Sequence, residues 1–294
     1  MADGAPALTV AVESGRARRS ATWRTLFGGA GGLGAAIIVI ATLAAVFAPW
    51  VAPYDPVALD PPARLLGPTA EHWLGTDQYG RDTLSRIIFG GRASLSVAAA
   101  STLFALLVGG GLGVLAAYYR GWTDGLIMRV TDVLLSFPAI LLAIALLAFL
   151  GQGMVNLVLA IGLVYVGPFA RVARAAVLTV REELFVEASR SLGSRDWRVL
   201  LKAVLPMASA PLIVEVTLRL AYGILAEASL SFLGLGTQPP AASWGLMVAE
   251  GRRFLQLSPW ATVAPGLAIM LVVLGFNLFG DALRDALDPR TRGR

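Results

Sequence analysis

The segment 181–211 forms a charged island between two strongly apolar stretches, and its sequence is REELFVEASRSLGSRDWRVLLKAVLPMASAP. Stretches as apolar as its two flanks are expected to cross a lipid bilayer, whereas a membrane-spanning helix cannot accommodate so many charges. The basic residues of the island are Arg181, Arg190, Arg195, Arg198 and Lys202. An excess of Lys and Arg places a loop of a bilayer protein on the cytoplasmic side. The island is therefore predicted to be a cytosolic loop of a membrane protein.

The order of residues within the island predicts a helix, a sharp turn and a second helix. Helix-forming residues continue to Leu192, and Gly193 can take the left-handed backbone conformation that ends a helix. Ser194 can then cap the second helix, because its hydroxyl accepts hydrogen bonds from the free amides of a first helical turn. We expect a rigid bent finger that is held between two membrane helices.

A spaced set of residues in the island resembles the EAA loop of ABC importer permeases. The set comprises Glu187, Ala188, Ser189, Gly193, Leu205 and Pro206. Ser189 stands where that family usually has a second alanine, and the replacement keeps the helix. The resemblance implies that the loop 181–206 couples this chain to separate ATPase subunits. It also implies that ATP and Mg are bound by those partners, with no cofactor in this chain.

Four further segments narrow the resemblance to the C-type permease subunits of dipeptide, oligopeptide and nickel transporters. They are HWLGTDQYGRDTLSRIIFGGRASLSV from His72, VTDVLLSFPAILLAI from Val130, AEASLSFLGLGTQPP from Ala226 and GDALRDALDPR from Gly280. The resemblance implies an all-α, polytopic membrane protein with six transmembrane helices, the transmembrane domain of a type I ABC importer. It also implies three kinds of partner: a homologous second permease subunit, two ATPase subunits and an extracytoplasmic substrate-binding protein. Similar permeases handle dipeptides, oligopeptides, nickel chelates and glutathione, and the sequence does not distinguish among these solutes.

Composition supports a membrane protein and argues against several other classes. Hydrophobic residues make up 56% of the chain and charged residues 15%, well below the quarter that is usual in soluble domains. The net charge is +5, but the Arg residues cluster at the ends of apolar spans, so membrane lipid is expected as a partner and nucleic acid is not. With no cysteine and only His72, the chain offers little material for a metal site or a catalytic centre. Together with the resemblance, this composition predicts a permease subunit and not an enzyme.

Six spans near the required length of about 20 apolar residues can be drawn. They are 31–51, 94–117, 133–149, 155–170, 207–229 and 261–279. Arg residues in both tails and after the second span fall on the island's side, which predicts that both termini are cytosolic. The resemblance implies a multi-pass protein of the bacterial or archaeal cytoplasmic (inner) membrane. The predicted divisions are a cytosolic tail 1–30, a first helix with its outer loop 31–90, a transmembrane core 91–282 and a cytosolic tail 283–294.

Small and ionisable residues within the spans mark candidate contacts. Gly109 and Gly113 have the spacing that lets two membrane helices approach closely. Glu215 and Arg219 stand four residues apart on one helical face, where they either neutralise each other or line a polar solute path. Glu227 either bonds to a neighbouring helix near an extracytoplasmic gate or reaches the lipid headgroups.

The segment 73–95 is predicted to form an amphipathic helix, because apolar residues recur at helical spacing with charges on the other face. Such a helix lies on the membrane surface or caps the pore. Its candidate vestibule residues are Asp77, Arg81, Asp82 and Arg86. The resemblance implies that a substrate-binding protein docks at this position. As an alternative, the helix only closes the lipid interface.

Pro138 lies within the predicted third span. Because proline lacks an amide hydrogen, it should kink the helix there. The kink acts either as a hinge or as a static bend.

A secondary transporter driven by an ion gradient is the alternative function. Such proteins typically contain inverted repeats and place their ion site at broken helices near the bilayer midplane. No inverted repeat is visible in this sequence, and the charged finger would have no motor to contact.

Overall fold

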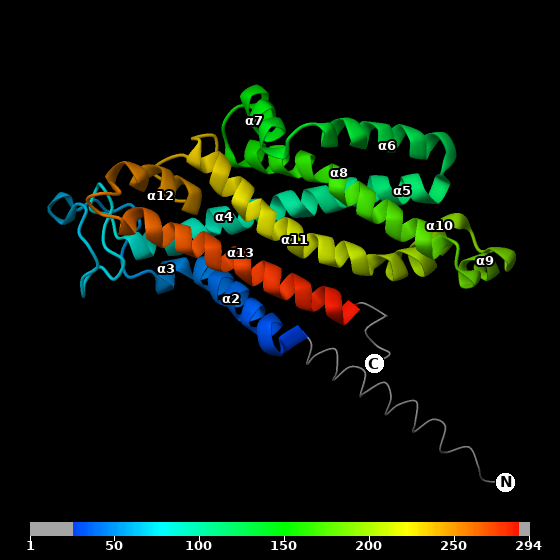
Figure 1. The fold of residues 1–294 in the computed structure, drawn as a ribbon, viewed down its shortest axis with the longest axis horizontal. Helices are drawn as coiled ribbons and strands as arrows, with labels where there is room; N and C mark the ends of the chain where they lie inside the picture. Colours follow the sequence, from blue (N-terminus) through cyan, green and yellow to red (C-terminus); the bar gives the residue numbers. More distant parts are fainter. Residues whose placement is uncertain (1–25, 288–294) are drawn as a thin grey trace, which may run out of the picture.

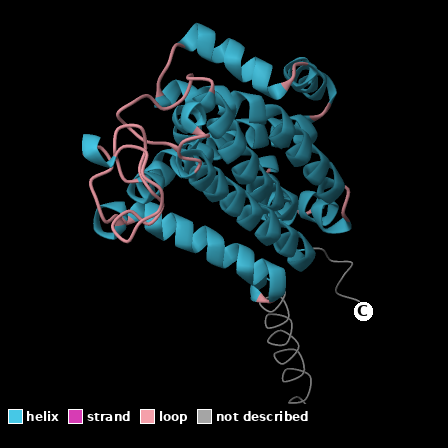
Figure 2. Ribbon diagram, turned by 60° about the vertical axis from the view of Figure 1, so that its left-hand side comes forward, coloured by secondary structure: helices cyan, strands magenta, loops and turns pink. Residues whose placement is uncertain are grey.

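The computed structural model describes residues 26–287, and its regular elements in that range are helices without any β-strand (Figure 2). Most helices run along one long axis, while extended loops gather at one end of the molecule (Figures 1 and 2). The elements before the charged island are α2 Gly29–Val46, α3 Ala48–Val51, η1 Pro61–Ala63, α4 Thr83–Ala105, η2 Leu106–Gly110, α5 Gly111–Tyr119, α6 Gly121–Ser136, α7 Ala139–Leu150 and α8 Met154–Arg181. The later elements are α9 Leu184–Ser191, α10 Asp196–Val199, η3 Leu200–Val204, α11 Leu205–Phe232, α12 Trp244–Gly251, η4 Arg252–Phe254 and α13 Trp260–Leu287.

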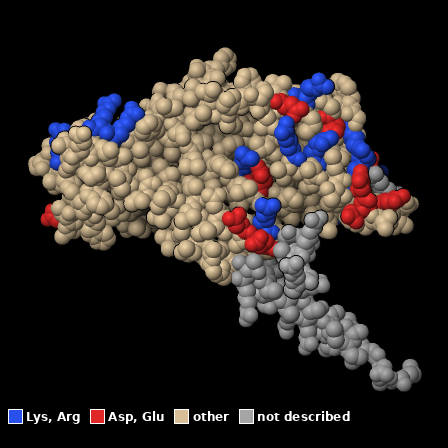
Figure 3. Space-filling model, viewed as in Figure 1, with Lys and Arg blue, Asp and Glu red and all other residues tan. Residues whose placement is uncertain are grey.

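Five helices in the described range are long and apolar enough to cross a membrane, and the pair α6 and α7 supplies a sixth span if it is counted as one. The number of spans thus matches the prediction, although the boundaries differ. Charged side chains gather toward the two ends of the long axis, and a broad, mostly uncharged band separates them (Figure 3). Such a band is what the hydrocarbon core of a bilayer requires. The predicted cytosolic tails fall largely outside the described residues.

The third span is not the single helix that hydropathy predicts. Helices α6 and α7 are bent by 95° at their junction, where Pro138 precedes the first residue of α7. Phe137, the residue before this proline, has an extended backbone with φ −90° and ψ 140°. Proline disfavours the helical conformation in the residue before it, so α6 ends there. The predicted kink is therefore a sharp break between two helices.

Two ion pairs hold α6 along α8. Arg174 binds Asp124 through two hydrogen bonds of 2.6 Å each, and Arg171 donates to Asp132 over 2.7 Å. The sequence did not reveal these pairs, because their members lie 39 and 50 residues apart. They leave α7 as the part of the third span that departs from the bundle axis.

The predicted surface helix over 73–95 is helical only from Thr83 onward, and its first part is wrong. Residues before Thr83 form a loop, with Gly75 and Gly80 at φ +72° and +79°, and α4 begins only at Thr83. Asp82 caps this helix by accepting a hydrogen bond from the Ser85 amide. From there α4, the π-helical turn η2 and α5 follow without a break, so one long helix leads from the loop end of the molecule through the bundle.

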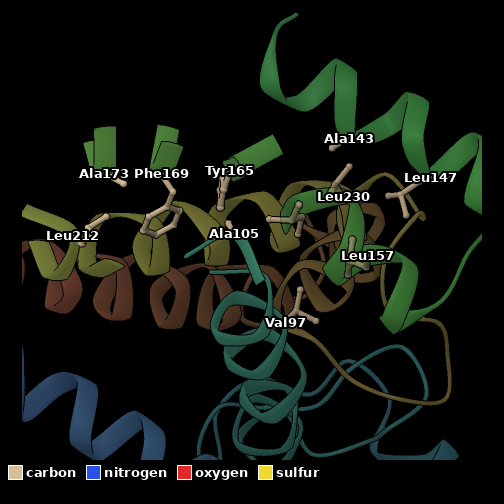
Figure 4. Close-up of a cluster of buried hydrophobic side chains, with 12 residues drawn as sticks. Val97, Ala105, Ala143, Leu147, Leu157, Tyr165, Phe169, Ala173, Leu212 and Leu230 are labelled. Carbon is tan, nitrogen blue, oxygen red and sulfur yellow. The ribbon is translucent and has the colours of Figure 1, made fainter. Parts of the chain in front are cut away.

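One apolar core lies where α4, α7, α8 and α11 meet (Figure 4). Figure 4 shows Phe169 and Leu157 of α8 in this cluster, together with Val97 of α4 and Leu230 of α11. All four side chains are fully removed from solvent. Burial of side chains this size stabilises a packed helix bundle in water, and within a bilayer their close packing holds the helices together.

Close approach of α8 to the second span depends on two glycines, as their spacing predicts. A Cβ atom at Gly109 would lie 2.3 Å from the carbonyl oxygen of Val166, and one at Gly113 would lie 2.2 Å from that of Ala170. No side chain fits at either position unless the two backbones separate.

Gly109→Ala should therefore destabilise the folded protein by roughly 1 to 3 kcal/mol, the usual cost of overpacking a tight contact. The measurement is the melting temperature of the purified chain in detergent. Gly111→Ala is the matched control, since nothing lies within 4 Å of its Cβ position. Equal melting temperatures for the two variants would contradict the packing described here.

Candidate functional site

The charged island forms a finger at one tip of the molecule, at the end opposite the loops and α12 (Figure 1). We define the finger as residues 184–199, which comprise α9, the turn after it and α10. Gly193 in this turn has φ +77°, as predicted, and no atom lies within 4 Å of its Cβ position. We call α9 the first arm of the finger and α10 the second arm. Leu184 at the start of the first arm and Leu192 directly after it are 81% and 86% exposed. The tip thus presents apolar side chains and a left-handed turn to its surroundings.

The predicted motif residues in the first arm lie on α9. Glu187 and Ala188 are exposed, whereas Ser189 is half-buried and donates a hydrogen bond of 2.8 Å to the carbonyl oxygen of Phe185. Val186 points to the opposite side and is fully buried. The motif therefore places a carboxylate and a small side chain on the outer face of a helix whose other face is anchored.

The second arm of the finger differs from the prediction. Ser194 does not cap it, because α10 begins at Asp196, and its N-cap residue Arg195 makes no side-chain capping bond. The helix then continues through η3 into α11 without a break, so Leu205 and Pro206 lie in the fifth span and not in a separate loop helix. Pro206 is the second residue of α11, directly after the π-helical turn η3. Proline has no amide hydrogen to donate within a helix, so the irregular turn lies where the regular hydrogen-bond pattern is interrupted.

An apolar cluster fixes the base of the finger to the spans. Val186, Val199 and Val204 pack with Ala117 of α5 and Val177 of α8. Each of these side chains is at most 2% exposed. The tip is therefore free, whereas the base is part of the bundle, and a force on the tip acts on α5, α8 and α11 together.

A second site lies at the loop end of the molecule, where four charged side chains form what we call the outer ion cluster: Asp77, Arg81, Arg86 and Glu250. Arg81 binds Asp77 over 2.6 Å and Glu250 over 3.1 Å. Arg86 binds Glu250 over 3.0 Å and lies 3.5 Å from Asp77. The side chain of Arg86 is only 1% exposed, so the charges are turned inward and not toward water as an amphipathic surface helix would have them.

Glu250 of α12 was not predicted as a partner of the vestibule residues. It joins a part of the chain 164 residues away from Arg86, and no local spacing reveals such a pairing. Glu250 is the only acidic residue between positions 230 and 260, and this was the one signal that the sequence offered.

Asp82 does not join this cluster, although it was predicted as a vestibule residue with the others. Its carboxylate accepts bonds of 2.7 Å from the amide and hydroxyl of Ser85 and lies 2.9 Å from Nδ1 of His72. Asp82 therefore caps α4 and fixes the preceding loop. Contact of any of these residues with a binding protein remains a prediction.

Glu215 and Arg219 form an ion pair on α11, as their spacing suggests, with Arg219 Nε 2.6 Å from a carboxylate oxygen. The guanidinium carbon also lies 5.2 Å from the ring centroid of Tyr165 and 5.7 Å from that of Tyr222. These two tyrosines were not singled out in the sequence. An ion pair between aromatic rings lowers the cost of charge within the bilayer, and its contact with a solute remains a prediction.

Glu227 is fully buried near the outer end of α11. Its carboxylate accepts hydrogen bonds from Ser94 of α4 over 2.7 Å and from Ser231 over 2.6 Å. The Trp244 amide at the start of α12 donates to the same Ser94 hydroxyl over 3.2 Å. Glu227 thus bonds directly to α4 and, through Ser94, is linked to α12, as expected for the first of the two predicted alternatives. A part in gating remains a prediction.

Comparison with known families gives two matches. The family described as "Binding-protein-dependent transport system inner membrane component" matches residues 109–293. A second family, described as "N-terminal TM domain of oligopeptide transport permease C", matches residues 30–68.

Two relatives with this kind of sequence are named as permease proteins of transport systems. The chain is 46% identical to a dipeptide transport system permease protein of Alkalihalophilus pseudofirmus, over 88% of this chain and 86% of that protein. It is 43% identical to a glutathione transport system permease protein of Pectobacterium atrosepticum, over 92% and 90% of the two chains. Among solved structures, an inward-facing form of the MetNI methionine ABC transporter superposes with a TM-score of 0.59 at 19% identity and covers 70% of this chain and 97% of that one. This last likeness concerns the fold alone.

Proposed function

The chain belongs to the family of binding-protein-dependent transport system inner membrane components, and from this premise we propose that it is one permease subunit of an ATP-driven importer of short peptides. Its relatives are named as transport permeases, so the chain is a permease and not an enzyme. The names of two relatives, for dipeptide and for glutathione transport, both specify short peptides. Dipeptides or similarly short peptides are therefore the solute class that we propose.

The observation that carries this proposal is the free finger tip at one end of the molecule (Figure 1), together with the outer ion cluster at the other end. We assign the finger to the cytosol, because it is rich in Arg and lies between two spans. Helix α2 begins and α13 ends on the finger's side, which supports cytosolic termini (Figure 1). The opposite end then faces outward, where a substrate-binding protein would dock.

We assign ATP binding, and the second half of the pore, to partner subunits. The glycine-rich run at Gly109 packs against α8 within the membrane and is not followed by the lysine of a phosphate-binding loop. We therefore place ATP and Mg on two separate ATPase subunits that dock on the finger, and we expect a homologous second permease to complete the pore. ATP shifts the pore between inward-open and outward-open states only because the ATPases bind those states differently.

The test is uptake into vesicles that hold this chain with its second permease and its ATPases. We expect uptake of a radiolabelled dipeptide to require ATP and loaded binding protein, and to persist when an ionophore removes all ion gradients. Uptake that stops with the ionophore and continues without ATP would instead establish the secondary transporter.

A further inference from the structure

Tyr118, near the end of α5, connects the second span with the finger. Its hydroxyl lies 2.8 Å from Oδ1 of Asp196 and 3.0 Å from the carbonyl oxygen of the same residue, and it donates to this residue. Asp196 is the first residue of α10, directly after the turn that contains Gly193. The tyrosine is only 4% exposed, so water does not compete freely for the bond. The contact joins residues 78 positions apart.

Arg181 holds Tyr118 in place from the end of α8. Its Nη1 atom donates to the carbonyl oxygen of Ala117 over 3.0 Å and also to that of Tyr118. Its guanidinium carbon lies 5.8 Å from the centroid of the Tyr118 ring. The last carbonyl groups of a helix have no partner within the helix, and a cation at this end is favourable. The end of α5, the end of α8 and the start of α10 therefore meet at one polar junction.

The helix that carries Tyr118 also reaches the opposite end of the molecule. Helix α4 begins at Thr83, includes Arg86 of the outer ion cluster, and continues through η2 into α5, which ends at Tyr119. Its middle part lies against α8 at Gly109 and Gly113. One long helix thus has the outer ion cluster at its first turn and the finger junction at its last.

We propose that the hydrogen bond from Tyr118 to Asp196 transmits movement between the finger and the α4–α5 helix, and so couples ATP hydrolysis to events at the outer end. This inference rests on the proposed function. Tyr118 is a positioning residue in this scheme, because it contacts neither solute nor nucleotide and acts through Asp196. The apolar base of the finger still holds α10 on the bundle when the bond is absent, so the bond governs coupling and not assembly.

The experiment compares Tyr118→Phe with wild type in vesicles that contain the complete transporter. Phenylalanine keeps the ring and removes only the hydroxyl group. Assembly and basal ATP hydrolysis should be unchanged, whereas stimulation of hydrolysis by loaded binding protein and dipeptide uptake should fall roughly 2- to 10-fold, the factor that one hydrogen bond is worth. Tyr119→Phe is the matched control, because this neighbour on the same helix is 60% exposed.

Variants of Asp196 distinguish loss of the hydrogen bond to Tyr118 from a general loss of folding. Asp196→Asn keeps an oxygen acceptor and should behave as wild type, whereas Asp196→Ala should show part of the Tyr118→Phe defect. The double variant Tyr118→Phe with Asp196→Ala should be no worse than Tyr118→Phe alone, since both changes remove one bond.

Two outcomes would overturn the inference: normal stimulation and uptake in Tyr118→Phe, or a loss of assembled complex that accounts for its defect. Failure of the proposed function would look different, because the wild-type complex itself would then show no ATP-dependent uptake.

Discussion

Gly193→Val should leave the chain in the membrane but abolish its productive contact with the ATPase subunits. The backbone at Gly193 has φ +77°, a conformation that costs an L-residue about 1 to 2 kcal/mol, and more for a β-branched side chain. Apart from the two neighbouring residues, no atom of this chain lies within 4 Å of the added Cβ, so this atom meets no other part of the fold. The expected defect therefore arises from the altered turn and from the surface that meets the partner. Co-purification of the ATPases and hydrolysis stimulated by binding protein measure it.

Gly234→Val provides a matched control for this prediction. Gly234 also has a positive φ, +81°, and also has no atom within 4 Å of its Cβ position. It follows the end of α11 near the outer face, far along the helix from the finger. The control should show similar backbone strain while it retains the ATPases. If both variants retained the ATPases with normal stimulated uptake, the assignment of the finger as the coupling element would be wrong.

Asparagine offers a further distinction at this position. Asn tolerates the left-handed conformation better than other residues with a side chain. Gly193→Asn should therefore recover the turn, so that any remaining defect reports contact with the partner alone. Comparison of ATPase co-purification in Gly193→Asn and in Gly193→Val therefore separates the effect of backbone strain from the effect of a changed contact surface.

Local features of this fold could be read from the sequence because their causes are local. The left-handed turn at Gly193 and the pair of Glu215 with Arg219 depend on residue type and on helical spacing over a few positions. The spans follow from runs of apolar residues, since each must match the thickness of a bilayer. The tight contact at Gly109 required only a known spacing of small residues.

Features that depend on distant segments could not be read in this way. The amphipathic pattern around Arg86 suggested a helix with its charges exposed to solvent. Instead, Glu250 of α12, 164 residues away, pairs with Arg86 and allows the arginine side chain to be buried. The contact of Tyr118 with Asp196 joins the ends of two spans that meet only in the folded bundle. Pro138 predicted a kink, but the sharp break of 95° depends on how α7 packs beyond it.

Glu250→Gln should strongly destabilise the outer end of the protein. Glu250 accepts hydrogen bonds from Arg81 over 3.1 Å and from Arg86 over 3.0 Å, and its side chain is 17% exposed. Glutamine has nearly the same shape but no charge, so two buried guanidinium groups would share only Asp77. Loss of one partner from a buried ion pair typically costs 3 to 5 kcal/mol, and the partial exposure here suggests about 3 kcal/mol. The melting temperature of the purified chain in detergent measures this loss.

Restoration of charge balance provides the decisive comparison. The double variant Arg81→Gln with Glu250→Gln leaves Arg86 and Asp77 as a neutral pair, 3.5 Å apart, so it should recover part of the lost stability. Glu71→Gln serves as the control for a change of charge on an exposed outer residue, and it should melt as the wild type does. If the double variant melted below Glu250→Gln alone, specific geometry and not charge balance would hold the outer ion cluster together. The cluster joins the first turn of α4 to α12, so its loss should also loosen the surface at which we place the binding protein.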